Sequence, residues 1–284
     1  MKPSLPANLT LGPVHLNVTN LPRSVEFYQQ ALGFRVHRQE NNTAYLGAGR
    51  TDLLTLTERP TAKRAPRTTG LYHFAILTPS RFELAQSLHR LAETRTPVQG
   101  FSDHLVSEAI YLGDPDGHGI EIYRDRPRTD WVDAAGNFRM GSEPLDIDGI
   151  LAELGEEPPA WSGLHANTVL GHMHLHVRHV PEAVRFYRDV LGFDVMAEWN
   201  GAAFVSAGGY HHHLGLNTWG TLNAPPPPPE SISLRSFIIT LPTTADLAQV
   251  HSRVLAAGLS VEPQTNGWLV RDPSQNQLIF THAA

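Results

Sequence analysis

The sequence contains no cysteine, which excludes disulfide bonds and thiolate metal sites, so any bound metal must use histidine and carboxylate ligands. Charged residues are also few, at 18% of the chain, and the formal net charge is -6, which argues against a surface for nucleic acid or anionic membrane. No stretch approaches the roughly 20 apolar residues that span a bilayer, and the opening residues lack an apolar signal segment. We expect a cytoplasmic protein with a small-molecule partner, no nucleic-acid partner and no membrane association.

Histidine, in contrast, is abundant, with 16 residues among 284, several of them in tight groups. The length suits two domains of ordinary size, whose cores need no metal as a structural staple. A metal bound by these histidines would therefore serve chemistry rather than folding.

The chain is built from internal repeats. PVHLNVTNLPRSVEFYQQALGFRV, from Pro13, aligns without gaps with HMHLHVRHVPEAVRFYRDVLGFDV, from His172. Each segment begins with an alternating strand, passes through a proline into an amphipathic helix, and stops at LGF, where Gly33 or Gly192 can cap the helix. A weaker pair links LYHFAILTPSRFELAQSL, from Leu71, with RSFIITLPTTADLAQV, from Arg235. The sequence thus predicts four modules, each with one helix and about four strands.

The fold class is therefore predicted as α+β, with four βαβββ modules in tandem, paired into two open, barrel-like cups. Residues 127–168 are rich in proline, glycine and acidic residues around a short helical patch, IDGILAEL, and are interpreted as a linker. The expected domains are 10–126 and 169–284, with two modules in each. The five prolines at 225–229 must be extended and cannot lie inside a sheet, so a stiff connector is expected there.

This module pattern resembles the vicinal oxygen chelate superfamily, which includes glyoxalase I, bleomycin-binding proteins and extradiol dioxygenases, and among these the chain is most similar to catechol 2,3-dioxygenases. The resemblance covers nearly the whole chain. It implies the fold but leaves the activity open, because many activities share this fold and function resides in the site.

In this family a module offers one metal ligand at the start of its first strand and another in its last strand. The second module matches at both places, with His73 and, within HGIEIY, Glu121. The third has His172 but Gly215 where a carboxylate would stand. The first and fourth modules offer no ligand. The resemblance thus implies a metal held by His73, His172 and Glu121.

Two histidines and one carboxylate with open positions form the facial triad of non-haem Fe(II) oxygenases, and Mn(II) suits the same ligands. Taken singly, each of these residues has an ordinary explanation as a polar strand residue or an ion-pair partner. Their joint occurrence at three family positions favours the metal site. Because only the second and third modules supply ligands, we expect one metal per chain built from those two modules, within one chain or across a homo-oligomer. The first and fourth modules would then pair without a metal.

The resemblance also implies three catalytic residues. His212, within GGYHHHLGLNTW, matches the acid–base histidine of related dioxygenases, and histidine titrates in the right range for proton transfer. Strand alternation would place His211 and His213 on one face and His212 on the other. Tyr111, ten residues before Glu121, matches a tyrosine that hydrogen-bonds the substrate, and His104 resembles a further histidine near the substrate oxygen, although its local spacing departs from the pattern. An ordinary sheet tyrosine or a histidine-rich strand would look the same.

The expected function is extradiol cleavage of a catechol-type aromatic diol by O2 at Fe(II), as in the breakdown of aromatic compounds. One rival is a glyoxalase- or thiol-transferase-like metalloenzyme of the same fold, although Gly215 cannot supply the second carboxylate that a glyoxalase-like metal would want. A second rival is a non-catalytic protein that binds aromatic compounds, as bleomycin-resistance proteins do, but those lack the triad.

Overall fold

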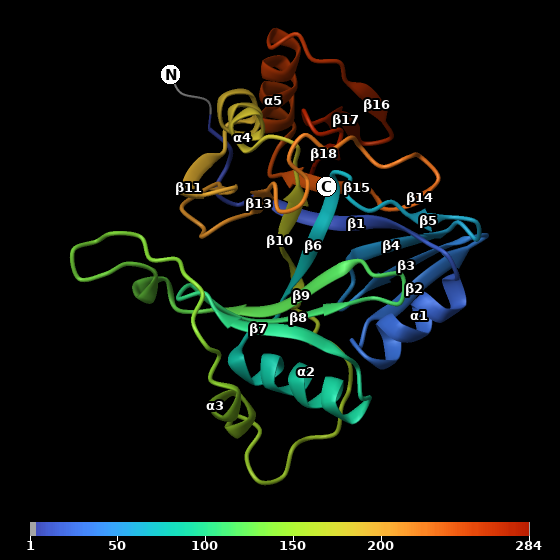
Figure 1. Cartoon of the computed structure of the whole chain (residues 1–284), viewed down its shortest axis with the longest axis vertical. Helices are drawn as coiled ribbons and strands as arrows, with labels where there is room; N and C mark the ends of the chain where they lie inside the picture. Colours follow the sequence, from blue (N-terminus) through green and yellow to red (C-terminus); the bar gives the residue numbers. More distant parts are fainter. Residues whose placement is uncertain (1–3, 284) are drawn as a thin grey trace. The chain divides into compact units, whose positions relative to one another are not determined.

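The computed structural model describes residues 4–283 and shows four consecutive βαβββ modules (Figure 1). The first has β1 Thr10–Val18, α1 Leu21–Gln30, β2 Arg35–Glu40, β3 Thr43–Gly47 and β4 Asp52–Glu58. The second has β6 Gly70–Leu77, α2 Arg81–Glu93, β7 Val98–Asp103, β8 Ser107–Gly113 and β9 Gly119–Asp125. The third has β10 Val169–His176, α4 Val180–Arg185, the π-helical turn η2 Phe186–Leu191, β11 Asp194–Trp199, β12 Ala202–Ser206 and β13 Leu214–Asn217. The fourth has β15 Leu234–Leu241, α5 Thr244–Ala256, β16 Glu262–Gln264, β17 Gly267–Arg271 and β18 Gln277–His282.

The segments between the modules carry only short elements. These are β5 Lys63–Arg64, η1 Arg128–Trp131, α3 Ile147–Ala152 and β14 Ser231–Ile232. The predicted α+β class and the four modules are confirmed, and the IDGILAEL patch does form a helix, α3. The proline run at 225–229 lies outside the strands, as its missing amide protons require. No helix in residues 4–283 is both long enough and apolar enough to cross a bilayer.

Contacts divide the chain into two compact units. Unit 1 takes in the residues up to 17, residues 61–72 and those from 171 onward, whereas unit 2 takes in residues 18–60 and 73–170. β6 and β10 each contain residues of both units. The domain limits 10–126 and 169–284 follow the sequence repeat, and they stay a prediction.

In unit 2 the helices lie on one face of antiparallel hairpins. Figure 1 shows α1 along β2, β3 and β4, and α2 along β7, β8 and β9; the sheets do not close into barrels. The helices begin where side chains cap them: Asn20 accepts the amide proton of Arg23 at 2.9 Å, and Ser80 accepts that of Phe82 at 3.2 Å. Gly33 has a φ of +80° after α1, as the expected cap requires.

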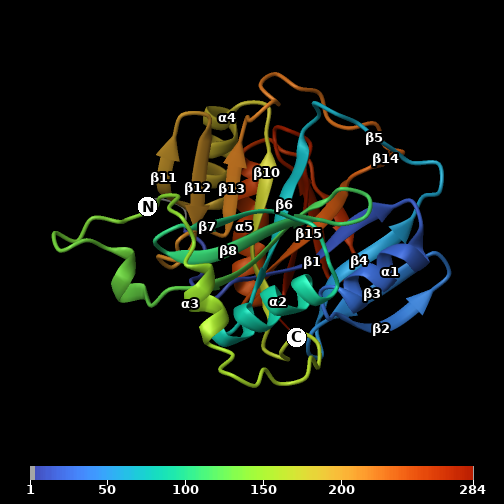
Figure 2. The same cartoon turned by 60° about the horizontal axis from the view of Figure 1, so that its bottom comes forward.

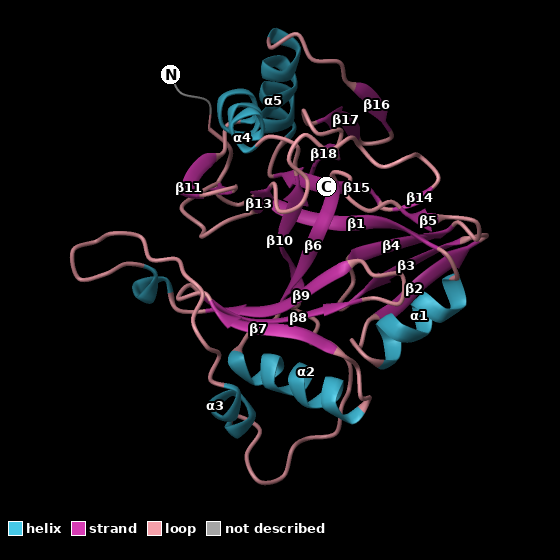
Figure 3. Ribbon diagram, viewed as in Figure 1, coloured by secondary structure: helices cyan, strands magenta, loops and turns pink. Residues whose placement is uncertain are grey.

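In unit 1 the first strands of the first and fourth modules are neighbours. β1 pairs antiparallel with β15, with Val14 opposite Phe237, and β15 pairs parallel with β18. β10 pairs parallel with β13, which continues to β12 and β11, and these four strands lie side by side in Figure 2. Figure 3 separates the helices from these strands by colour. Tyr72, at the start of β6, packs edge-on against His174 of β10, with 5.0 Å between ring centroids. The first strands of modules one and four are thus hydrogen-bonded neighbours.

In each unit a buried tyrosine hydroxyl donates a hydrogen bond to a buried aspartate that turns a hairpin, an arrangement called here the tyrosine–aspartate lock. In unit 2, Asp114 turns the β8–β9 hairpin by accepting the amides of Asp116 and His118, and it also accepts His118 Nδ1 at 2.8 Å and the Tyr28 hydroxyl at 3.0 Å. In unit 1, Asp272 turns the β17–β18 hairpin by accepting the amides of Ser274 and Asn276, the Asn276 side chain and, at 3.0 Å, the Tyr187 hydroxyl. Each lock joins the helix of one module to the last hairpin of the next.

The two locks differ in charge. Burial pushes the pKa of Asp114 upward, but the ion pair with His118 and the hydrogen bonds from His118 and Tyr28 outweigh it, so the pKa lies below its usual value. Asp272 faces Asn276 instead, and burial raises its pKa to about 6 against its hydrogen bonds. Histidine at one turn and asparagine at the other therefore give two aspartates of opposite pH behaviour.

This contrast predicts opposite pH effects on stability. The raised pKa of Asp272 means that its contribution is fully present below about pH 4 and lost as the pH rises through 6, a loss of about 3 kcal/mol. Asp272→Asn should therefore become more stable relative to the wild type as the pH rises from 4 to 7. Asp114→Asn should be less stable than the wild type at neutral pH, and the difference should shrink in acid. Urea unfolding across this pH range measures both, and shifts of the same sign for the two variants would contradict the assignment.

Candidate metal centre

The β8–β9 hairpin places Tyr111 beside Glu121. The two strands are antiparallel, and the register set by the turn at Asp114 puts Tyr111 directly opposite Glu121. Residues directly opposite one another in antiparallel strands project from the same face of the sheet. The ten residues that separate Tyr111 from Glu121 in the sequence are therefore those that the chain needs to pass through the hairpin turn and return to the opposite position.

Glu121 also meets His73 of β6. β6 runs parallel to β9, and His73 Nε2 lies 2.9 Å from Glu121 Oε2. Glu121 is only 2% exposed and His73 only 5% exposed. A carboxylate at that depth requires compensating positive charge, because isolated burial of a charge is strongly unfavourable. Protonated His73 could supply that charge, and so could a bound cation.

Tyr111 is oriented by His104, which follows β7. The Tyr111 hydroxyl lies 2.6 Å from His104 Nε2, and His104 Nδ1 lies 2.7 Å from the carbonyl oxygen of Gly141. A carbonyl oxygen can only accept, so His104 Nδ1 donates to Gly141. When the ring is neutral, Nε2 is then the acceptor and the tyrosine hydroxyl donates to it.

The linker takes part in this arrangement. Glu143 forms a β-bridge with Asp103, and the Ser142 hydroxyl lies 2.8 Å from that of Ser102. These contacts hold the Gly141 carbonyl at the end of β7. Residues 127–168 were expected to form only a connector, and the role of Gly141 was not predicted, because a backbone acceptor leaves no signal in residue type.

In unit 1, His172 is 1% exposed on β10, and His174, two residues further along the strand, lies opposite Gly215 of β13. A Cβ atom at position 215 would lie 2.7–3.0 Å from three ring atoms of His174. The space beside Gly215 is thus filled by the His174 ring, which also contacts Phe204, with 5.7 Å between centroids. The missing carboxylate of the third module has a steric cause.

The three consecutive histidines do not lie in a strand, so the predicted alternation of their faces was wrong. β12 ends at Ser206 and β13 begins at Leu214, and His211–His213 belong to the loop between them. Three polar rings with Gly208 and Gly209, both at positive φ, favour a tight loop over an extended strand. The loop brings His212 against His172, with 4.1 Å between ring centroids.

The remaining histidines near these strands have structural roles. His118 holds the turn through Asp114, and His176 Nδ1 lies 2.9 Å from the side-chain oxygen of Asn217. His179 occupies the N-cap position of α4.

Unit 2 contributes His73 and Glu121 to the expected ligand set, and unit 1 contributes His172. All three residues are buried, and within unit 2 His73 Nε2 lies 2.9 Å from Glu121 Oε2. Two imidazoles and one carboxylate fit a divalent metal of intermediate hardness. The chain therefore holds a His–Glu–His group that could bind a metal.

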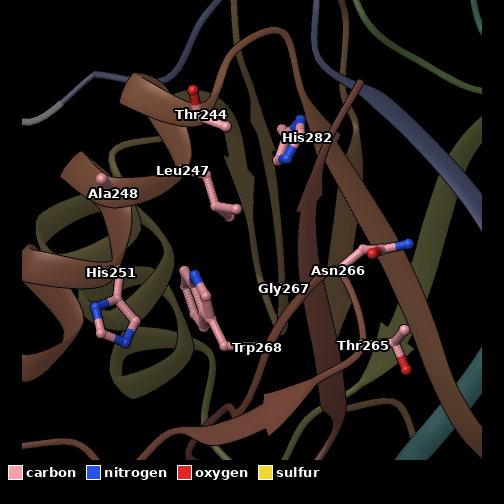
Figure 4. Close-up of a pocket in the computed structure, with 9 residues that line it drawn as sticks. All are labelled: Thr244, Leu247, Ala248, His251, Thr265, Asn266, Gly267, Trp268 and His282. Carbon is pink, nitrogen blue, oxygen red and sulfur yellow. The ribbon is translucent and has the colours of Figure 1, made fainter. Parts of the chain in front are cut away.

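A separate cavity in the fourth module does not offer this chemistry. Figure 4 shows side chains from α5 and from β17 and β18 around a space of about 460 Å³. It is lined by Leu247, His251, Trp268 and His282 among others, and no carboxylate lines it. None of the six site residues expected from the sequence lies there.

Comparisons with known proteins agree with this fold. Residues 10–122 and 169–280 match the model of the Glyoxalase/Bleomycin resistance protein/Dioxygenase superfamily. A catechol-2,3-dioxygenase of Bacillus subtilis (strain 168) is 46% identical over 269 residues, covering 93% of both chains. A lactoylglutathione lyase of Neisseria meningitidis serogroup B is 27% identical over 126 residues, which is 41% of this chain and 91% of that protein.

Solved structures show the same fold at low sequence identity. A crystal structure of a protein from Bacillus subtilis subsp. subtilis str. 168 superimposes with a TM-score of 0.66 at 13% identity, covering 99% of this chain and 86% of that one. Glyoxalase I from Zea mays gives a TM-score of 0.59 at 14% identity, covering 97% and 92%.

The His–Glu–His group predicts that the protein binds one divalent metal per chain. Replacement of His73 or His172 by Ala, or of Glu121 by Gln, should weaken metal binding by more than the ~10- to 100-fold that is lost with outer supporting residues. His251→Ala, which removes a histidine of the fourth-module cavity, is the matched control and should retain full occupancy. Elemental analysis after anaerobic loading and gel filtration measures the occupancy, and full occupancy in all three ligand variants would refute the site.

Proposed function

Because the chain belongs to the Glyoxalase/Bleomycin resistance protein/Dioxygenase superfamily, we propose that it is an extradiol ring-cleaving dioxygenase that opens a catechol-type diol with O2. The observation that carries the proposal is the donor set of two buried histidines and one buried carboxylate. The relative that is 46% identical over nearly its whole length bears the name of this activity.

The residues fit Fe(II), and Mn(II) is the second candidate. His73, Glu121 and His172 would hold the metal through two neutral nitrogens and one anionic oxygen, which leaves coordination positions for substrate and O2. When bound, the metal would bring the vicinal oxygens of the diol next to O2 and allow electrons to pass between them. Glu121 would provide the negative charge that balances the cation in a buried place.

Tyr111 would position the substrate. Since its hydroxyl proton is directed to His104, its oxygen accepts a hydrogen bond from a hydroxyl of the diol. His104 and the Gly141 carbonyl fix this direction. The pair therefore favours a substrate that still carries a proton on the oxygen nearest Tyr111.

His212 would move the proton. It lies against His172, and a histidine is the side chain best suited to take and return a proton near neutral pH. In the proposed reaction His212 accepts a proton from the second diol hydroxyl and returns it to the product. The ring opens beside the diol, and both atoms of O2 enter the product.

The rivals that the sequence left open are less well supported. The lactoylglutathione lyase from Neisseria matches less than half of this chain. A fourth protein ligand at position 215 is sterically blocked by His174. A protein that merely binds aromatic compounds would not need a carboxylate buried against a histidine. Metal content with no activity on catechol under O2, or dependence on a thiol cofactor, would favour the lyase-like alternative.

The proposal predicts ring-cleavage activity that depends on His212 and Tyr111. Anaerobically loaded protein mixed with catechol and O2 should give the yellow ring-opened product. His212→Phe should lower kcat by about 10²- to 10⁴-fold, the usual contribution of a general acid–base group. Tyr111→Phe should lower activity by about tenfold, since it removes one hydrogen bond worth 0.5–1.5 kcal/mol.

Controls separate this outcome from loss of structure. His212→Phe should bind the metal as tightly as the wild type, because His212 is not among the proposed ligands. His251→Ala should turn over at the wild-type rate. Absence of ring-opened product from iron- and manganese-loaded wild-type protein across a panel of catechols would overturn the proposed activity.

A further inference from the structure

His211 makes a direct hydrogen bond to the neighbouring His212. Nδ1 of His211 lies 2.8 Å from Nδ1 of His212, and both residues are buried, at 0% and 5% exposure. Adjacent side chains in an extended strand point to opposite faces and cannot meet in this way. The contact exists because the chain bends at the loop between β12 and β13.

The bond constrains the protons on both rings. Two imidazole nitrogens at this distance must share one proton, so one Nδ1 donates and the other accepts. Two rings that each carried a proton on Nδ1 would repel, and two that carried none would leave a buried pair of acceptors facing each other. The contact therefore couples the tautomers of His211 and His212.

Other rings hold this pair in place. Tyr210 packs on His211, with 4.1 Å between centroids and an angle of 34° between the ring planes. On the other side, His212 packs against His172 at 4.1 Å and edge-on against Phe204 at 5.1 Å. The ring of His212 is thus fixed by packing on two sides and by a hydrogen bond on a third.

We propose that His211 is a positioning residue that holds His212 in the ring orientation and tautomer needed for proton transfer to and from the substrate. This inference rests on the proposed function. For Nε2 of His212 to accept the proton of the diol, Nδ1 of His212 must carry the shared proton and donate it to Nδ1 of His211. His211 itself touches neither substrate nor metal in this scheme, and it acts through His212 alone.

The neighbouring His213 has a different task and provides a control. Its Nδ1 accepts the amide proton of Ala207 at 3.2 Å and lies 2.9 Å from the Ser206 hydroxyl, so it closes the loop onto the end of β12. His213→Asn removes an imidazole from the same loop but keeps an acceptor near the Nδ1 position. It should leave kcat within about threefold of the wild type, because the hydrogen bond is retained and the activation free energy then changes by less than about 0.7 kcal/mol.

The test compares two substitutions at position 211. His211→Phe keeps a ring of similar size without the hydrogen bond, whereas His211→Asn places an amide near the lost Nδ1. His211→Phe should lower kcat by about 10- to 100-fold, the range found when a residue that orients a functional histidine is removed. The anaerobic dissociation constant for catechol and the iron occupancy should stay unchanged, and His211→Asn should restore most of kcat.

A measurement on the metal-free protein provides a second readout. In wild-type protein with isotopically labelled histidine rings, nuclear magnetic resonance should show a proton on Nδ1 of His212, none on Nδ1 of His211, and a hydrogen bond between the two atoms. In His211→Phe the signal of His212 should change to a mixture of tautomers. This readout does not depend on activity or on the folding of any variant, because the wild type alone is sufficient to test the bond.

Several results would overturn the inference. They are a wild-type spectrum in which Nδ1 of His212 lacks a proton, a kcat for His211→Phe equal to that of the wild type, and an equal loss in His213→Asn. Loss of catechol binding in parallel with kcat would also refute a role through His212. Failure of the wild-type enzyme to cleave any catechol would instead refute the proposed function, so the two failures are distinguishable.

Discussion

Glu121 is a carboxylate with 2% exposure set 2.9 Å from a histidine nitrogen, and this buried charge is the constraint on which the proposed site depends. Placing a charged pair at such depth is rarely favourable for stability, because desolvation of both groups offsets their attraction. A cation held by the carboxylate would give that arrangement a purpose. Tyr111 lies opposite Glu121 in the neighbouring strand. Its hydroxyl is oriented by a chain of hydrogen bonds that runs through His104 to the carbonyl of Gly141.

The repeated module shows how a site can be confined to part of a duplicated fold. The tyrosine–aspartate lock occurs in both units, with a tyrosine hydroxyl, two turn amides and one side chain of the turn donating to the aspartate, because it fixes a helix to a hairpin whatever the chemistry. The proposed ligand positions differ between the modules instead. Pro13 in the first module corresponds to His172 in the third, and Ser236 in the fourth corresponds to His73 in the second. At Gly215 the ring of His174 occupies the space that a side chain would need. Stability and function thus rest on different residues of one pattern.

Much of the fold follows from patterns of local origin. Alternating strands, capped helices and the LGF stops identify four modules, since each depends on residues close together in the sequence. The ten-residue spacing of Tyr111 and Glu121 also proves informative, because a tight hairpin converts sequence distance into a cross-strand pair.

The loop of His211–His213 was misread as a strand, because aromatic and apolar residues on both sides continue the alternation, while the two preceding glycines open a bend. The role of Gly141 could not be predicted either, since any residue offers a carbonyl and only the folded linker brings this one to His104. The second miss concerns a segment whose course depends on distant contacts. The proposed metal ligands, in contrast, were expected from their positions in the module.

Anomalous diffraction at the iron edge from crystals of the anaerobically loaded protein tests the central claim most directly. The account predicts one iron per chain within bonding distance of a nitrogen of His73, a nitrogen of His172 and an oxygen of Glu121, with no further protein ligand. Iron bound elsewhere, or coordinated without Glu121, would contradict it.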